Sequence, residues 1–260
     1  MHAWLLAFAV FLSGCGEVWN NPYPAQETGR NILYSAFTER PKHLDPVQSY
    51  SEDEAEFNAQ IYEPPLQYHY LKRPYTLIPL TAEALPRPRS VDAAGREVPA
   101  DSPRVAHTLY EIRIRPGILY QPHPAFARDP DGKLLYHNLK PDDLKGIYSL
   151  RDFPQTGTRE LTAEDYAYQI KRLAHPRLHS PVFGLMSEYI VGLKAFAETL
   201  KTEDKALAAS GTGNAWLDLS KFQLAGVELV DKYRYRIRIK GRYPQFAYWL
   251  AMNFFAPVPI

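Results

Sequence analysis

The alternation of apolar and polar positions predicts strands with one exposed face. In residues 108–115, TLYEIRIR, tyrosine and isoleucine alternate with charged residues. In residues 226–241, GVELVDKYRYRIRIKG, the same two-residue period occurs on both sides of a turn near Asp231. This period places apolar side chains on one face of a strand and charged ones on the other. We therefore predict a strand at 108–115 and a β-hairpin at 226–241.

A longer apolar period predicts helices. Residues 161–176, LTAEDYAYQIKRLAHP, have one apolar face and end at a proline. Thr162 and Asp165 have the spacing of a capping box at its start. Ser51 and Glu54 have the same spacing before a second segment that two prolines end. We predict a helix in each place.

The remaining segments complete a mixed α/β pattern. Residues 181–200 are predicted to form one mostly buried helix, and residues 31–37, NILYSAF, a first strand. Residues 86–103 are polar and rich in proline, which predicts a loop. Residues 127–160 combine charge, glycine and proline with short apolar pieces, so we expect an inserted excursion with short local elements.

The last segment, residues 243–260, is strongly apolar and has no capping residue or polar tail. Such a segment exposes apolar surface unless something covers it. We expect the chain to be a fragment of a longer protein and to be poorly soluble alone.

The N-terminus has the features of an export signal. Ala3–Leu12 is an apolar run of ten residues, too short for a membrane span of about 20 residues. The following residues, LSGC at 12–15, resemble a bacterial lipobox. We predict a signal peptide at 1–14, a lipid on Cys15 and a polar tether over 15–30. The alternative is a buried N-terminal element with an inert thiol.

Composition excludes several classes of function. Lys and Arg total 30 against 29 Asp and Glu, so no basic field for nucleic acid is present. A single cysteine cannot form an intramolecular disulfide. The 18 tyrosines suit adaptable binding surfaces, although a loop-rich exported protein would also contain many.

The chain lacks the motifs of nucleotide binding, nucleophilic catalysis and metalloproteases. His175 and His179 are four residues apart, but Pro176 lies between them, so a helical metal pair is not expected. The acidic run after Ser51 lacks the pattern of a calcium loop. SGTGN at 210–214 fits a flexible linker better than an anion cradle. We predict no catalytic residue, metal or cofactor.

Five segments occur in an order that resembles a known family, the extracytoplasmic solute-binding proteins of oligopeptide and dipeptide ABC transporters (family 5, which includes nickel-chelate binders). The segments are RPKHLDPVQSYSEDEAEFNAQIYEPPLQY (40–68), LTAEALP (80–86), TLYEIRIRPGILYQPHPAF (108–126), LTAEDYAYQIKRLAHP (161–176) and GVELV to APVP (226–259). The resemblance implies a two-lobed, α/β periplasmic-binding-protein-like fold of class II. Residues 31–260 would be its N-terminal part, without the second lobe.

The resemblance also implies a function. Members of the family are not enzymes: they capture peptides outside the inner membrane and deliver them to a permease with an ATPase subunit. They hold the peptide by main-chain hydrogen bonds. The segment that lies against the peptide matches Tyr50, Ser51 and Glu52 here, so these three are the predicted ligand-binding residues. Ser51 and Glu52 could instead, or in addition, cap the helix. The expected location is the periplasm, with a lipid anchor.

Departures from the family pattern leave other functions open. Residues 127–160 are an insertion, HPAF stands in place of the usual turn, and EPP replaces the usual Glu-Gly after the first helix. The resemblance implies that the lobe that discriminates ligands lies outside this sequence, so a nickel chelate, a sugar or an opine remains an alternative to a peptide. A surface lipoprotein outside transport and a lipoprotein hydrolase are further alternatives.

Overall fold

The computed structural model describes residue 23 and residues 25–27, 29–137, 139–211 and 216–260. They fall into two compact units, residues 1–39 and 40–260. The predicted signal peptide and Cys15 lie outside the described residues. In the first unit, η1 (Ala25–Glu27) precedes residues 31–37. The strand predicted there is wrong, because these residues pair with no other strand among those described.

The second unit is built on a four-stranded antiparallel sheet of order β3-β4-β6-β5. The strands are β3 (Arg89–Val91), β4 (His107–Arg113), β6 (Arg234–Lys240) and β5 (Val227–Asp231). The predicted strand and hairpin are thus confirmed. β3 lies within residues 86–103, which were predicted to form a loop, so that prediction is wrong for these three residues. A strand of three residues is too short to show an alternating pattern in the sequence.

The alternating side chains divide the sheet into a buried and a charged face. Tyr110 pairs with Ile237 in the β4–β6 register, and both are at most 2% exposed. On the other face, Arg236 donates to Glu111 at 2.7 Å and to Glu228 at 2.8 Å. These cross-strand ion pairs stabilise the exposed face, each by less than about 1 kcal/mol.

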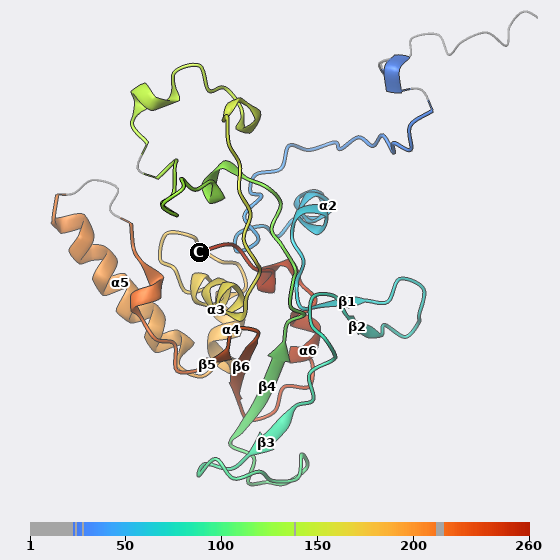
Figure 1. Ribbon diagram of the computed structural model, residues 1–260. Coiled ribbons are helices and arrows are strands. Elements are labelled where there is room, and N and C mark those ends of the chain that lie inside the picture. Colours follow the sequence, from blue (N-terminus) through green and yellow to red (C-terminus); the bar gives the residue numbers. More distant parts are fainter. Residues whose placement is uncertain (1–22, 24, 28, 138, 212–215) are drawn as a thin grey trace, which may run out of the picture. The chain divides into compact units, whose positions relative to one another are not determined.

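Helix α3 (Ala163–Arg172) packs against β5 and β6. Its predicted cap is present, since the Thr162 N–H donates to the Asp165 carboxylate at 2.9 Å. Asp165 is fully buried and forms an ion pair with Arg159. The Tyr166 ring stacks on the Tyr235 ring with centroids 5.4 Å apart, which joins the helix to the sheet. Figure 1 shows α3 beside the sheet and α2 (Glu52–Ile61), the second predicted helix, above it.

The single helix predicted at 181–200 is wrong. The structure has α4 (Phe183–Tyr189) and α5 (Leu193–Ala209) instead. Ile190 leaves the helix to form a β-bridge with Ile239, and Gly192 adopts the left-handed conformation with φ of 77°. Glycine alone adopts this conformation without strain, so the chain turns here.

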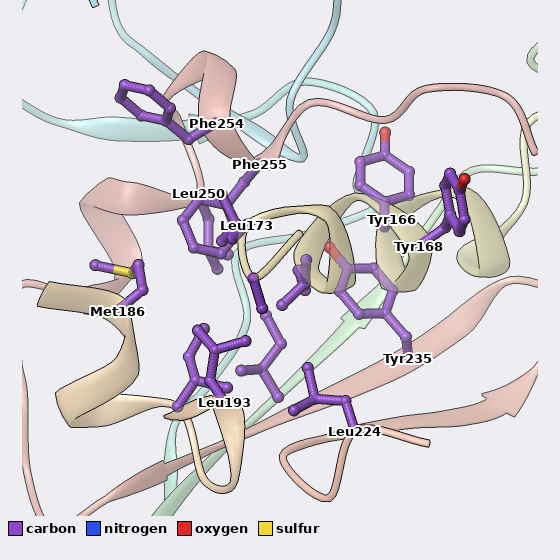
Figure 2. Close-up of a cluster of buried hydrophobic side chains, with 14 of the residues drawn as sticks. Tyr166, Tyr168, Leu173, Met186, Leu193, Leu224, Tyr235, Leu250, Phe254 and Phe255 are labelled. Carbon is purple, nitrogen blue, oxygen red and sulfur yellow. The ribbon is translucent and has the colours of Figure 1, made fainter. Parts of the chain in front are cut away.

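The apolar C-terminal segment, which the sequence predicts to expose apolar surface unless something covers it, is largely buried. It contains α6 (Phe246–Trp249) and η6 (Asn253–Phe255). Phe246 and Leu250 are fully buried, and Phe255 is 2% exposed. Figure 2 shows Leu250, Phe254 and Phe255 in one cluster with side chains of α3, α4 and the sheet. Side chains from residues 40–240 cover this segment. These partners are distant in the sequence, so the sequence alone does not show them.

The remaining elements are short. β1 (Leu66–Tyr68) and β2 (Leu77–Pro79) form a separate antiparallel hairpin, which projects from the body of the second unit (Figure 1). The described residues of the predicted excursion 127–160 contain short 3-10 helices and isolated β-bridges, such as Arg128 with Leu134. The 3-10 helices of the second unit other than η6 are η2 (Pro124–Phe126), η3 (Pro141–Leu144), η4 (Leu150–Asp152) and η5 (Leu219–Lys221). No helix in the described part of the chain has the length and apolar character needed to cross a membrane.

Candidate ligand-binding site

The turn before α2 is attached to the end of α3. Arg172 donates to both carboxylate oxygens of Asp45, at 3.1 and 2.5 Å. The same carboxylate accepts from the Val47 N–H at 3.0 Å, and the Asp45 carbonyl accepts from the Ser49 N–H at 2.9 Å. A bidentate pair fixes both the distance and the plane of its two groups. The turn that leads to Tyr50 therefore has a defined position.

Glu54 holds the other side of this turn. Its buried carboxylate accepts backbone N–H groups from Lys42 at 3.0 Å, His43 at 2.8 Å, Tyr50 at 3.0 Å and Ser51 at 3.3 Å. Burial raises the pKa of Glu54, but the backbone donors outweigh it and lower the pKa to about 2. The carboxylate is thus ionised, and its four hydrogen bonds order the chain on both sides of the turn.

The three predicted ligand-binding residues lie together at the exposed start of α2. Tyr50 is 75% exposed, and Ser51 and Glu52 are also exposed. The Tyr50 ring lies 6.3 Å from the ring of Phe254, centroid to centroid. The Tyr50 carbonyl makes no hydrogen bond within the described residues, so it is available to a ligand N–H. Ser51 is also the N-cap of the helix, so the capping role applies as well.

A pocket of about 410 Å³ lies where the end of α3, the segment before η5 and the last residues meet. Its walls are Tyr168, Arg172, Trp216, Asp218, Val258, Pro259 and Ile260. Trp216 is 73% exposed and presents a broad aromatic surface. The Ser220 hydroxyl and backbone lower the pKa of Asp218 against the opposing effect of burial. The pocket therefore combines aromatic and aliphatic walls with one cation and one anion.

Arg172 belongs to both the pocket and the turn. Besides its pair with Asp45, its guanidinium donates to the Gln169 side-chain oxygen at 3.0 Å. The Gln169 amide in turn donates to the Phe254 carbonyl at 3.0 Å, and the Phe254 ring lies near Tyr50. Two hydrogen bonds and the ring contact between Phe254 and Tyr50 thus connect the pocket to the exposed stretch at 50–52, and the two together form one candidate site.

Sequence reasoning did not predict the pocket. Its residues come from three segments, around positions 168–172, 216–218 and 258–260, that only the fold brings together. One feature of the sequence could have indicated a binding site here. Trp216 follows a glycine-rich stretch, where a large aromatic residue has no local structural role. Residues 210–214 by themselves indicate only a flexible linker.

The described residues contain no group of three or more His, Cys, Asp or Glu side chains that could hold a metal ion. The His175 ring accepts the Arg177 N–H at 3.1 Å, which orders the turn after α3. Burial lowers the pKa of His175. His179 has a φ of 50° and comes directly after that turn.

Comparison with known proteins gives structural matches only. No family model and no curated protein matches the sequence. Among solved structures, the murein tripeptide binding protein MppA of Escherichia coli is 17% identical with a TM-score of 0.48, over 86% of this chain and 30% of that one. A periplasmic oligopeptide-binding protein of Borrelia burgdorferi is 14% identical with a TM-score of 0.47, over 84% and 29%.

A third match is the periplasmic binding protein DppA of Helicobacter pylori, in complex with a peptide. It is 14% identical with a TM-score of 0.44, over 83% of this chain and 28% of that one. The chain thus spans less than a third of each of these proteins. They are peptide-binding proteins, the class that the sequence resemblance named. At such low identity no residue role passes from them to this chain.

Proposed function

We propose that this chain is the peptide-capturing component of an ABC importer. The observation that carries the proposal is the series of contacts through Arg172, Gln169 and Phe254 that links the pocket to the exposed stretch at 50–52. An extended peptide could pair its backbone N–H with the Tyr50 carbonyl and place side chains against Trp216. Arg172 and Asp218 supply charges of both signs, which suit a zwitterionic ligand. The order of the five sequence segments supports the same class.

The proposal includes a cellular setting that rests on the sequence. The lipobox-like LSGC would place a lipid on Cys15 after removal of residues 1–14. The tether would then keep the binding body outside the inner membrane, close to a permease and its ATPase. A tether of about 15 residues reaches roughly 20 Å by the square-root rule for flexible chains. Metabolic labelling with palmitate tests this directly: the native chain should incorporate label and Cys15→Ala should not.

Peptide binding is tested on the full chain by thermal shift with a pool of di- to pentapeptides, followed by calorimetry with each peptide that shifts the Tm. We expect Tyr50→Ala and Trp216→Ala each to weaken binding by about tenfold, the loss typical of an aromatic contact at a binding site. Tyr148→Ala is the matched control, because Tyr148 is 93% exposed and lies outside the site.

Three results would count against the proposal. One is the absence of any shift with peptides, and another is equal peptide affinity in all three variants. The third is a shift with a nickel chelate or a sugar in the absence of any peptide effect. That outcome would assign the site to another class of solute.

A further inference from the structure

The loop between β1 and β2, residues 69–76, forms a tip that carries large exposed apolar side chains. Tyr70 is 88% exposed, Leu71 77% and Tyr75 62%. Tyr70 and Leu71 are adjacent and together form a protruding apolar surface. The peptide site described above does not include this tip.

The tip has a defined shape. The His69 ring accepts the N–H groups of Leu71 at 3.2 Å and Lys72 at 3.3 Å. The Arg73 guanidinium donates to the Lys72 carbonyl at 3.0 Å and lies over the Tyr75 ring, 4.7 Å from its centroid. These contacts satisfy backbone groups within the loop, so the outward direction of Tyr70 and Leu71 is built into its structure.

Below the tip lies a layer of tyrosines. The Tyr68 ring makes an edge contact with Tyr75 at 5.8 Å and stacks on Tyr248 at 6.0 Å, centroid to centroid. All three rings are more than a third exposed. Tyr70 and Leu71 at the end of the hairpin are therefore backed by a band of three tyrosines, Tyr68 and Tyr75 from the hairpin and Tyr248 from α6.

The charge of the hairpin has one sign. Lys72 and Arg73 are exposed at the tip, and no acidic residue occurs in the sequence between Glu63 and Glu83. Over the whole chain positive and negative residues nearly balance. This local excess of positive charge is complementary to an anionic surface.

We propose that the hairpin tip docks on an anionic lipid surface. Tyr70 and Leu71 enter the boundary between headgroups and acyl chains, and Lys72 and Arg73 contact lipid phosphates. The band of tyrosines lies at headgroup level, where amphipathic rings are favoured. A protein partner fits less well, because a stable interface takes about 20–30 residues a side and is depleted in lysine. The proposal is independent of the ligand of the peptide site.

A fluorescent label at the tip tests the proposal. The chain has one cysteine, so Cys15→Ser with Leu71→Cys offers a single thiol for a polarity-sensitive NBD dye. We expect a blue shift with vesicles of equal parts phosphatidylglycerol and phosphatidylcholine, and its loss in high salt. Dye attached through Ala100→Cys in the same Cys15→Ser background, at another exposed position, should not shift. This comparison separates the tip from the apolar run Ala3–Leu12.

Three outcomes overturn the proposal. The first is no shift at position 71, and the second is an equal shift with pure phosphatidylcholine. The third is a shift on adding unlabelled chain without vesicles, which would make a second copy the occupant.

Vesicle co-sedimentation of the full chain supplies a second test. Lys72→Gln with Arg73→Gln should lower partitioning into the anionic vesicles by about 30-fold. Lys194→Gln with Lys205→Gln, an equal change of charge on exposed positions of α5, should change it by about twofold or less. Tyr70→Ser with Leu71→Ser should also lower partitioning while leaving the Tm unchanged. Equal loss in both charge variants would show that only net charge matters and would overturn the proposal.

Discussion

Arg172 and Asp45 form a two-point ion pair between segments that are 127 residues apart in the sequence. Their side chains are 15% and 27% exposed, so the pair is largely shielded from water. It attaches the turn before α2 to the end of α3, and it places Arg172 at the edge of the pocket. One contact thereby connects the stability of the second unit with the geometry of the candidate site.

Breaking this pair should destabilise the protein more than breaking an exposed pair. Because the remaining charge is left partly buried, Asp45→Asn or Arg172→Met should each lower the free energy of unfolding by about 1–3 kcal/mol. The double variant should lose less than the sum of the two. Lys201→Met with Glu198→Gln, a pair in which both side chains are exposed, should cost less than about 1 kcal/mol. Urea denaturation measures all of these, and additive losses at Asp45 and Arg172 would contradict the role of the pair.

Glu54 should make the stability of the protein depend on pH under acidic conditions. Its pKa falls from 4.5 to about 2 on folding. A lowered folded-state pKa gives stability that is fully present above the unfolded-state pKa and is lost as the pH falls toward the folded-state pKa. The Tm difference between the native chain and Glu54→Gln should therefore be constant above about pH 5 and shrink as the pH falls toward about 2. Glu56→Gln, at an exposed position of α2, is the control. A Tm difference for Glu54→Gln that does not change with pH would refute the prediction.

Gly192 should tolerate alanine poorly, in contrast to a glycine inside a helix. Gly192 has a φ of 77°, and an added Cβ would lie 3.1 Å from the Ala225 Cβ. Gly192→Ala should therefore cost about 1–2 kcal/mol or more. Gly184 lies within α4 with open space around it, so Gly184→Ala should stabilise by about 0.5–1 kcal/mol. Thermal denaturation of both variants gives the comparison, and the same sign for both would be the contrary result.

Asn58 offers a test by removal of a buried amide. Both polar atoms of its side chain are buried without a hydrogen-bond partner among the described residues. Because an unpaired amide costs about 1–3 kcal/mol, Asn58→Leu should raise the Tm. Gln169 is equally buried, but its side-chain nitrogen and oxygen both have hydrogen-bond partners. Gln169→Leu should therefore lower the Tm. A lower Tm for Asn58→Leu would show that the amide is satisfied in solution.

Elements with strong local signals were predicted from sequence. The capping boxes at Ser51 and Thr162 locate the starts of α2 and α3, and strict alternation locates β4 and β6. Local signals failed where tertiary contacts decide the conformation. The bridge between Ile190 and Ile239 ends α4, and nothing in residues 181–200 alone indicates that partner.

The candidate site also has one part that local sequence indicates and one part that only the fold brings together. Tyr50, Ser51 and Glu52 are adjacent in sequence and were proposed together, and the structure holds them in one exposed stretch. Their role in ligand binding stays a prediction. The pocket required Tyr168, Trp216 and Val258 to meet, and sequence inspection offers no rule that brings such distant positions together.

The pairing of β4 with β6 has a consequence for the order of assembly. All seven residues of β4 pair with β6, although even the nearest partners, Arg113 and Arg234, are 121 positions apart in the sequence (234 − 113). During synthesis the pairing of β4 with β6 cannot be completed until Lys240 has left the ribosome, so this edge of β4 must wait for its partner. The same pairing predicts that a single proteolytic cut within the exposed excursion 127–160 leaves two pieces that stay bound to each other, each contributing one of the two central strands.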